Sequence, residues 1–214
     1  MIYAYDKVYL DKARISLGRM LDFAVHDLGY DLEEFFNLFI KTGLADRFGT
    51  GDFSLIVGMS GVELAYKVLE ESNITVDRGE VKYSVDRSEE YWTGWALAYY
   101  QWYTALTFKD IIGFIAINDI KDLYHPYHEM DIRQFVDKLN EFYKEQKQDT
   151  NLKLLRSQLG MSQRELAELS GVPLRTIQQY EQRQKNINNA KAEYIIRLAK
   201  VLVCDVEDLI EKVA

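Results

Sequence analysis

Apolar residues recur at helical spacing along most of the chain, and this pattern predicts a mainly α-helical protein. The first predicted helix covers residues 4–28. Asp31 and Ser60 then stand where N-terminal caps are expected, each followed by a further helix. Residues 44–58 have the glycine and aspartate content of a loop. Later helices are predicted over 88–106, over 131–147, over 190–203 and after Asp205, with two short helical turns within 108–124.

One segment departs from this spacing. Ile74 and Val76 alternate with polar residues, 77–80 has turn composition, and Val81, Tyr83 and Val85 alternate again. This period of two predicts a small β-hairpin, which would need the helices as a neighbour to be stable.

The helix predicted over 88–106 is unusually aromatic. Trp92, Trp95 and Tyr99 lie on one broad face, while Gly94 and Ala98 would let a neighbouring helix come close. Two interpretations stay open. The helix is either the centre of the N-terminal core or an aromatic groove that receives a partner or small ligand, because tyrosine and tryptophan suit both.

The stretch 162–181 reads as two short helices joined by a tight turn. Ser162 and Glu165 have the spacing of a capping box. Gly171 can adopt the positive φ that ends the first helix, and Pro173 restarts the chain as the second. The second helix turns Ile177 and Tyr180 inward.

The opposite face of that second helix carries side chains that read base edges. A guanidinium pairs with guanine, carboxamides pair with adenine, and an apolar side chain contacts the thymine methyl group. An amide at the start of the first helix is suited to a phosphate. The predicted DNA-binding residues are Gln163, Leu174, Arg175, Thr176, Gln178, Gln179, Arg183, Lys185 and Asn186.

These residues resemble the helix-turn-helix of the phage-repressor (Cro/C1, or XRE) family. The likeness rests on Gln163, Glu165-Leu166-Ala167, Gly171-Val172, Thr176-Ile177 and Tyr180-Glu181. It implies a compact five-helix domain over 151–214 and a homodimer on a palindromic operator. Family members usually carry glycine where Arg183 stands, so the turn that leaves the second helix is expected to differ.

The chain therefore divides into a mostly helical domain, 1–147, and a DNA-binding domain, 151–214, joined through the polar segment 143–151. That segment is either a linker or a continuation of the preceding helix. The net charge of −8 divides unequally. Residues 151–214 hold ten basic and eight acidic residues, whereas 1–150 hold sixteen and twenty-six. The basic residues thus concentrate where phosphate would be met, and the acidic part is expected to bind no nucleic acid.

The candidate chemistry is sparse. One cysteine indicates a reducing compartment, and with no signal peptide or membrane-length apolar run we expect a cytoplasmic protein outside the membrane. No phosphate loop, dinucleotide fingerprint or nucleophile elbow occurs, so we predict no catalytic residue, no cofactor and no enzyme. His125, His128 and Glu129 invite a metal interpretation, but their spacing matches no standard motif, and we predict no metal site.

A second, short likeness concerns the N-terminal part. Residues 60–65, preceded by Gly43 and 46–48, are similar to small bacterial domains found with toxin–antitoxin loci. The leading hypothesis is thus a sequence-specific DNA-binding regulator, a repressor and antitoxin whose residues 1–147 bind a toxin or another protein. The alternatives are a protein-capture module with minor DNA binding, and a ligand sensor or enzyme in 1–147 with DNA binding as its output.

Overall fold

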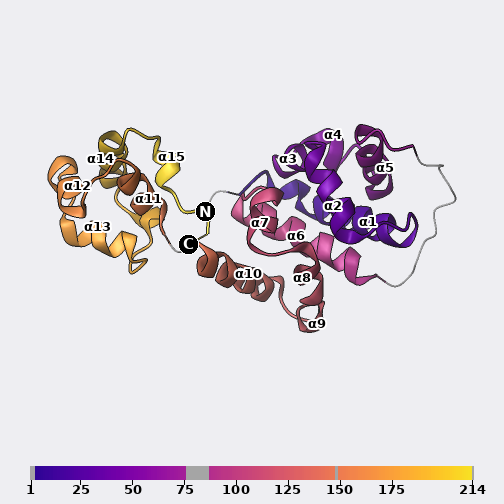
Figure 1. The fold of residues 1–214 in the computed structure, drawn as a ribbon. Coiled ribbons are helices and arrows are strands. Elements are labelled where there is room, and N and C mark those ends of the chain that lie inside the picture. Colours follow the sequence, from indigo (N-terminus) through magenta and orange to yellow (C-terminus); the bar gives the residue numbers. More distant parts are fainter. Residues whose placement is uncertain (1–2, 76–86, 148, 214) are drawn as a thin grey trace. The chain divides into compact units, whose positions relative to one another are not determined.

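The computed structural model describes residues 3–75, 87–147 and 149–213. They form two compact units, Met1–Phe142 and Tyr143–Ala214 (Figure 1). The described residues contain helices and no strand, in agreement with the predicted mainly α fold. The predicted hairpin, 74–85, falls almost wholly on 76–86, outside the described residues.

The first unit holds the 3-10 turn η1 and helices α1 to α10, the last of which continues into the second unit. Their bounds are η1 Lys7–Tyr9, α1 Leu10–His26, α2 Leu32–Lys41, α3 Leu44–Gly49, α4 Phe53–Ile56, α5 Gly61–Glu71, α6 Glu89–Thr104, α7 Phe108–Phe114, α8 Ile117–Asp122, α9 Tyr124–Tyr127 and α10 Ile132–Gln146. Asp31 and Ser60 cap α2 and α5 as predicted, the latter through a full capping box with Glu63.

Two of these boundaries correct the sequence analysis. The first predicted helix, 4–28, begins only at Leu10, because Asp6 accepts a hydrogen bond from the Val8 amide and caps a separate 3-10 turn. The predicted loop 44–58 contains α3 and α4. Asp52 caps α4, and the chain around it buries Phe48, so local capping and burial shape a segment whose composition suggested a loop.

The pair α1 and α6 forms the centre of the first unit, and glycines let the two helices approach closely. A Cβ on Gly94 would lie 2.6 Å from the Leu17 carbonyl oxygen, and one on Gly18 would lie 2.7 Å from the Tyr91 carbonyl oxygen. Both positions therefore exclude a side chain unless the backbones move apart. The expectation that Gly94 admits a neighbouring helix is confirmed.

Most of α6 is buried, as a central core helix requires. Trp92 and Trp102 lie in the core, and Tyr100 is fully buried, whereas Trp95 and Tyr99 are only partly covered. The guanidinium of Arg14 lies 3.3 Å from the Trp95 ring centroid and covers that face. Most of α6 therefore forms part of the N-terminal core, as the first of the two interpretations expected.

The second unit begins in the last turn of α10 and holds five further helices and a 3-10 turn. They are α11 Asn151–Gln158, α12 Gln163–Ser170, α13 Leu174–Glu181, η2 Ile187–Asn189, α14 Ala192–Leu202 and α15 Val206–Leu209. Leu166, Ile177 and Leu198 are fully buried in their shared core. Thr150 caps α11, so α10 and α11 are separate helices and not one continuous helix. The five-helix plan implied by the resemblance is confirmed.

Candidate nucleic-acid interface

The turn between α12 and α13 has the geometry predicted from its sequence. Ser162 Oγ accepts from the Glu165 amide at 3.1 Å, and Glu165 Oε2 accepts from the Ser162 amide at 2.7 Å. The hydrogen bond from the Ser162 amide, and next the interaction with the Ser162 side chain, lower the pKa of Glu165. Gly171 ends α12 at φ +67°, and Pro173 takes the N-cap position of α13, one residue before the first helical residue. The turn thus fixes how α13 is presented.

A buried charged cluster ties α13 to the two preceding helices. Glu181, whose side chain is 2% exposed, accepts from Nε and Nη2 of Arg156 at 2.7 and 2.9 Å, and from Gln163 Nε2 at 2.7 Å. The hydrogen bonds to Glu181 raise the pKa of Arg156, with partial burial opposing them. A two-pronged contact of this kind also fixes direction, so the cluster sets the orientation of α13.

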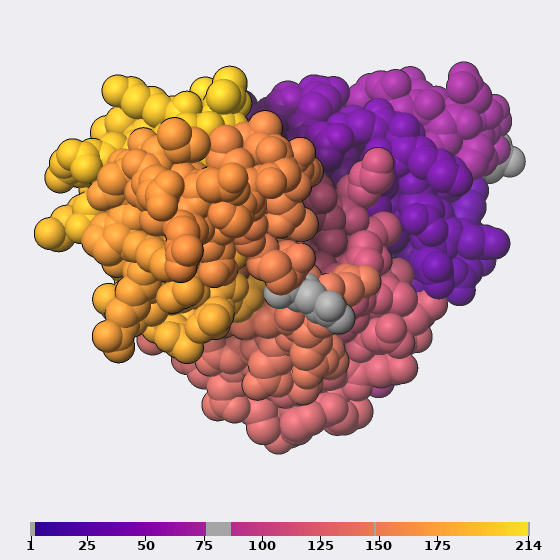
Figure 2. All heavy atoms as spheres, turned by 60° about the vertical axis from the view of Figure 1, so that its left-hand side comes forward, coloured from indigo at the N-terminus to yellow at the C-terminus, as the bar shows by residue number. Residues whose placement is uncertain are grey.

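The predicted base-reading residues lie on the outward side of α13. Arg175 is exposed, and Gln178 and Gln179 are partly exposed, while Ile177 and Tyr180 point into the core. Within the described residues, the side chains of Arg175, Gln178 and Gln179 make no hydrogen bond, so their donors and acceptors stay available. Leu174 and Thr176 are partly exposed beside them. In Figure 2, the orange atoms around α12 and α13 form a broad surface of this unit.

The other predicted residues are divided between exposed and engaged side chains. Lys185 is exposed. Gln163 Nε2 donates one hydrogen to Glu181, which leaves its second N–H and its amide oxygen. Asn186 Oδ1 accepts from the Asn188 amide at 2.8 Å as the cap of η2. Arg183 is the most engaged, because its Nη2 donates to the carbonyl oxygens of Lys147 at 3.0 Å and Asp149 at 3.3 Å.

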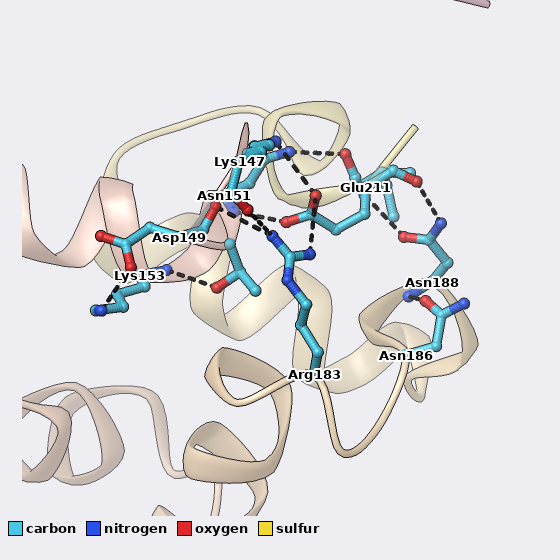
Figure 3. Close-up of polar contacts among 10 residues, drawn as sticks. Lys147, Asp149, Asn151, Lys153, Arg183, Asn186, Asn188 and Glu211 are labelled. Carbon is cyan, nitrogen blue, oxygen red and sulfur yellow. Dashed lines mark hydrogen bonds and ion pairs between the residues drawn. The ribbon is translucent and has the colours of Figure 1, made fainter. Parts of the chain in front are cut away.

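Arg183 also resolves how the turn after α13 is made. Its φ is +54°, the left-handed conformation that glycine adopts easily, so the backbone keeps the shape that a glycine at this position would favour. The expectation that the turn would differ for lack of glycine is therefore wrong for the backbone. What differs is the side chain, which points to the segment between α10 and α11 (Figure 3).

A network centred on Glu211 completes this corner of the unit. Glu211 Oε1 accepts from the Asn151 amide at 2.6 Å, and Oε2 accepts from Lys147 Nζ at 3.2 Å. Asn188 bonds both the amide and the carbonyl oxygen of Glu211, at 2.9 and 2.6 Å. The C-terminal residues are thus held against the start of α11 and the loop after α13 (Figure 3).

Comparison with known families identifies the unit that carries these features. A helix-turn-helix family model matches residues 152–209. This segment is an XRE-type helix-turn-helix domain. The match indicates a sequence-specific DNA-binding regulator. The chain matches no curated protein and no solved structure, and the likeness of residues 60–65 to toxin–antitoxin domains stays a prediction.

Two residues that shape the XRE-type domain, Arg156 and Glu211, were not predicted from the sequence. Arg156 lies one turn after the buried Leu152 in α11, and a charge at such an inward position signals a buried partner. Glu211 carried no comparable signal, because its partners lie as far as 64 residues away in the sequence.

Two properties of the described residues bear on other functions. They contain no group of three or more histidine, cysteine, aspartate or glutamate residues placed to hold a metal ion. None of their helices combines the length and apolarity needed to cross a bilayer.

Proposed function

We propose that the chain is a transcriptional repressor that binds a palindromic operator as a homodimer. The observation that carries the proposal is the outward face of α13, where Arg175, Gln178 and Gln179 offer free hydrogen-bonding groups on a helix fixed by the buried Arg156–Glu181 pair. One such helix reads only a few base pairs, and a second copy one helical turn away supplies the affinity that a single small domain lacks.

Selection of duplexes from a random pool by the full-length protein tests this proposal. The expected product is a defined sequence with two related half-sites whose centres lie about 10 base pairs, or a multiple of that, apart. Sedimentation of the complex should then give two chains per duplex. Recovery of no consensus would refute sequence-specific binding, and a single half-site with one chain would refute the dimer.

For the N-terminal unit, we propose a protein-binding role without catalysis, as in an antitoxin that captures a toxin. A cluster of exposed apolar side chains favours it. Val8 is 72% and Phe53 60% exposed, and the Tyr9 and Phe53 rings lie 6.1 Å apart, which brings η1 next to α4. Because residues 1–150 have an excess of ten acidic residues, a basic partner is favoured by charge.

Affinity purification of the tagged full-length protein from its native cells tests the capture role. We expect a basic protein to co-purify in stoichiometric amount with the wild type. It should be lost from the Phe53→Ser variant and retained by Lys41→Ser, a control substitution at an exposed position on α2 outside the apolar cluster. The competing function is a ligand sensor or enzyme in the same unit. Strong thermal stabilisation of the first unit by one compound from a nucleotide and metabolite screen would favour that function over capture.

A further inference from the structure

The XRE-type domain contains a pocket at the C-terminal end of α13, and three of its lining residues, Arg183, Lys185 and Asn186, are also predicted to contact DNA. Its volume is about 170 Å³. Leu152, Tyr180, Ile187 and Val213 provide an apolar lining, and each of these four residues is buried. A cavity of about 150 Å³ holds one benzene-sized molecule, so the pocket has room for a small ring or a branched chain.

Three of the polar side chains at the pocket are cationic, and the neutral Thr150 and Asn186 also line it. Lys144, Arg183 and Lys185 line it, and Lys144 and Lys185 are exposed. One acidic residue, Glu211, is also part of the lining, but Lys147 Nζ and the Asn151 amide already bond to its carboxylate. The pocket therefore combines an apolar interior with an excess of positive charge.

Arg183 has hydrogen-bonding capacity left over at this place. Its Nη2 donates to the Lys147 and Asp149 carbonyl oxygens, whereas Nη1 lies 3.9 Å from Glu211 Oε2, beyond hydrogen-bond distance. Within the described part of the chain, Nε and Nη1 make no hydrogen bond. Nε and Nη1 do not share an edge of the guanidinium, so Arg183 cannot make the two-pronged contact that Arg156 makes with Glu181. Each of the two nitrogens can still donate a single charged hydrogen bond to a carboxylate oxygen.

We propose that this pocket binds a small amphipathic carboxylic acid, with an apolar body between Leu152, Ile187 and Val213 and its carboxylate toward Arg183, Lys144 and Lys185. Most of the lining residues lie within the segment that matches the helix-turn-helix family, residues 152–209, whereas Lys144, Thr150, Glu211 and Val213 flank it. Residues outside the matched segment thus complete the site.

Binding there is coupled to DNA recognition, a step that rests on the proposed function. Tyr180 belongs to α13, and Arg183 and Lys185 follow it directly. A bound carboxylate neutralises positive charge next to the helix that approaches DNA, so DNA affinity falls when the site is occupied.

Titration of the full-length, isotope-labelled protein with benzoate, followed by NMR without DNA, tests the site itself. We expect saturable shifts of the Ile187 and Val213 methyl signals with a Kd of about 10 mM or tighter, the range open to a ligand of this size. Benzyl alcohol, which has the same ring without the charge, should bind at least about tenfold more weakly, and acetate, which lacks the ring, should also bind weakly.

Lys144 provides the matched variants, because it lies outside the predicted DNA-binding residues. Lys144→Gln should weaken benzoate binding by about two- to fivefold, and Lys144→Arg should retain it. Equal binding of benzoate and benzyl alcohol, or no methyl shift at about 10 mM benzoate, would overturn the site.

The coupling is tested separately, with the selected duplex and at constant ionic strength. Benzoate should lower the DNA affinity of the wild type more than acetate at the same concentration, and less so in Lys144→Gln. An unchanged affinity in a protein that binds benzoate would overturn the coupling alone. A protein that binds no duplex would refute the proposed function, while the NMR titration would still decide the site.

Discussion

The left-handed backbone at Arg183 can be tested by whether an alanine or a glycine at this position gives the more stable protein. The residue holds a left-handed φ of +54° and donates Nη2 hydrogen bonds to two carbonyl oxygens. Arg183→Ala keeps the strained backbone and loses those bonds. Since the side chain is 28% exposed, we take the lower end of the range for charged hydrogen bonds and expect a loss of about 1.5 kcal/mol.

Arg183→Gly loses the same bonds, but it relieves the backbone strain of the left-handed conformation, which stabilises the folded state by about 1–2 kcal/mol. The greater freedom of glycine in the unfolded chain offsets about 0.5–1 kcal/mol of that gain. The glycine variant should therefore be more stable than the alanine variant by about 0.5–1 kcal/mol. At an ordinary helical φ the order would be reversed, because glycine is the worse helix residue by a similar amount.

Native-state hydrogen exchange of amides in α12 to α14 measures this difference in the second unit. All three tryptophans, Trp92, Trp95 and Trp102, lie in the first unit, so fluorescence-detected urea unfolding serves as the internal control and should not change. An alanine variant that protects these amides better than the glycine variant would refute the assigned backbone conformation and the reasoning built on it.

Three further predictions concern buried pairs and close packing. Arg156→Met should destabilise the second unit by about 3 kcal/mol, measured by hydrogen exchange, because it leaves the Glu181 carboxylate buried without its cation. Adding Glu181→Met should recover part of that loss. A double variant less stable than the single variant would contradict this prediction. Gly94→Ala should lower the free energy of unfolding of the first unit by about 1–3 kcal/mol in a urea titration, since its Cβ would lie 2.6 Å from a carbonyl oxygen of α1. The control Gly113→Ala, which has open space for its Cβ, should be neutral or stabilising in the same titration. Burial, the largest single influence, raises the pKa of Glu90, but the hydrogen bond to His26, a backbone hydrogen bond and the charges of His26 and Lys121 together outweigh it and leave the pKa below the ordinary 4.5. The stability lost in Glu90→Gln should therefore be present above pH 4.5 and disappear as the pH falls through the lowered pKa. A pH-independent difference would argue against the ion pair.

The features that the sequence predicted well are those encoded by neighbouring residues. Ser162 and Glu165 are three positions apart, and Gly171 stands directly after the helix that it ends, so capping and turn geometry followed from local pattern. The close approach of α1 and α6 at Gly94 was also predicted from the sequence, because a glycine inside an apolar helix indicates a backbone contact.

The features that it predicted poorly depend on contacts between distant parts of the chain. The role of Arg183 could not be read from the sequence, because a glycine-like backbone and a side chain bonded to Lys147 both require the folded unit. The short helices α3 and α4 were hidden for another reason. A helix of four to six residues has too few apolar positions to show a period, and burial by the rest of the unit stabilises it.

The central claim is that the outward face of α13 reads base edges, and a paired substitution on the selected duplex tests it most directly. Arg175→Ala should cost about 1–3 kcal/mol at one base-pair position and relax the preference there alone. Lys185→Ala should weaken binding evenly across sequences and reduce the slope of log affinity against log salt by about one. If Arg175→Ala instead weakened binding to every sequence alike, the assignment of α13 as the recognition helix would be contradicted.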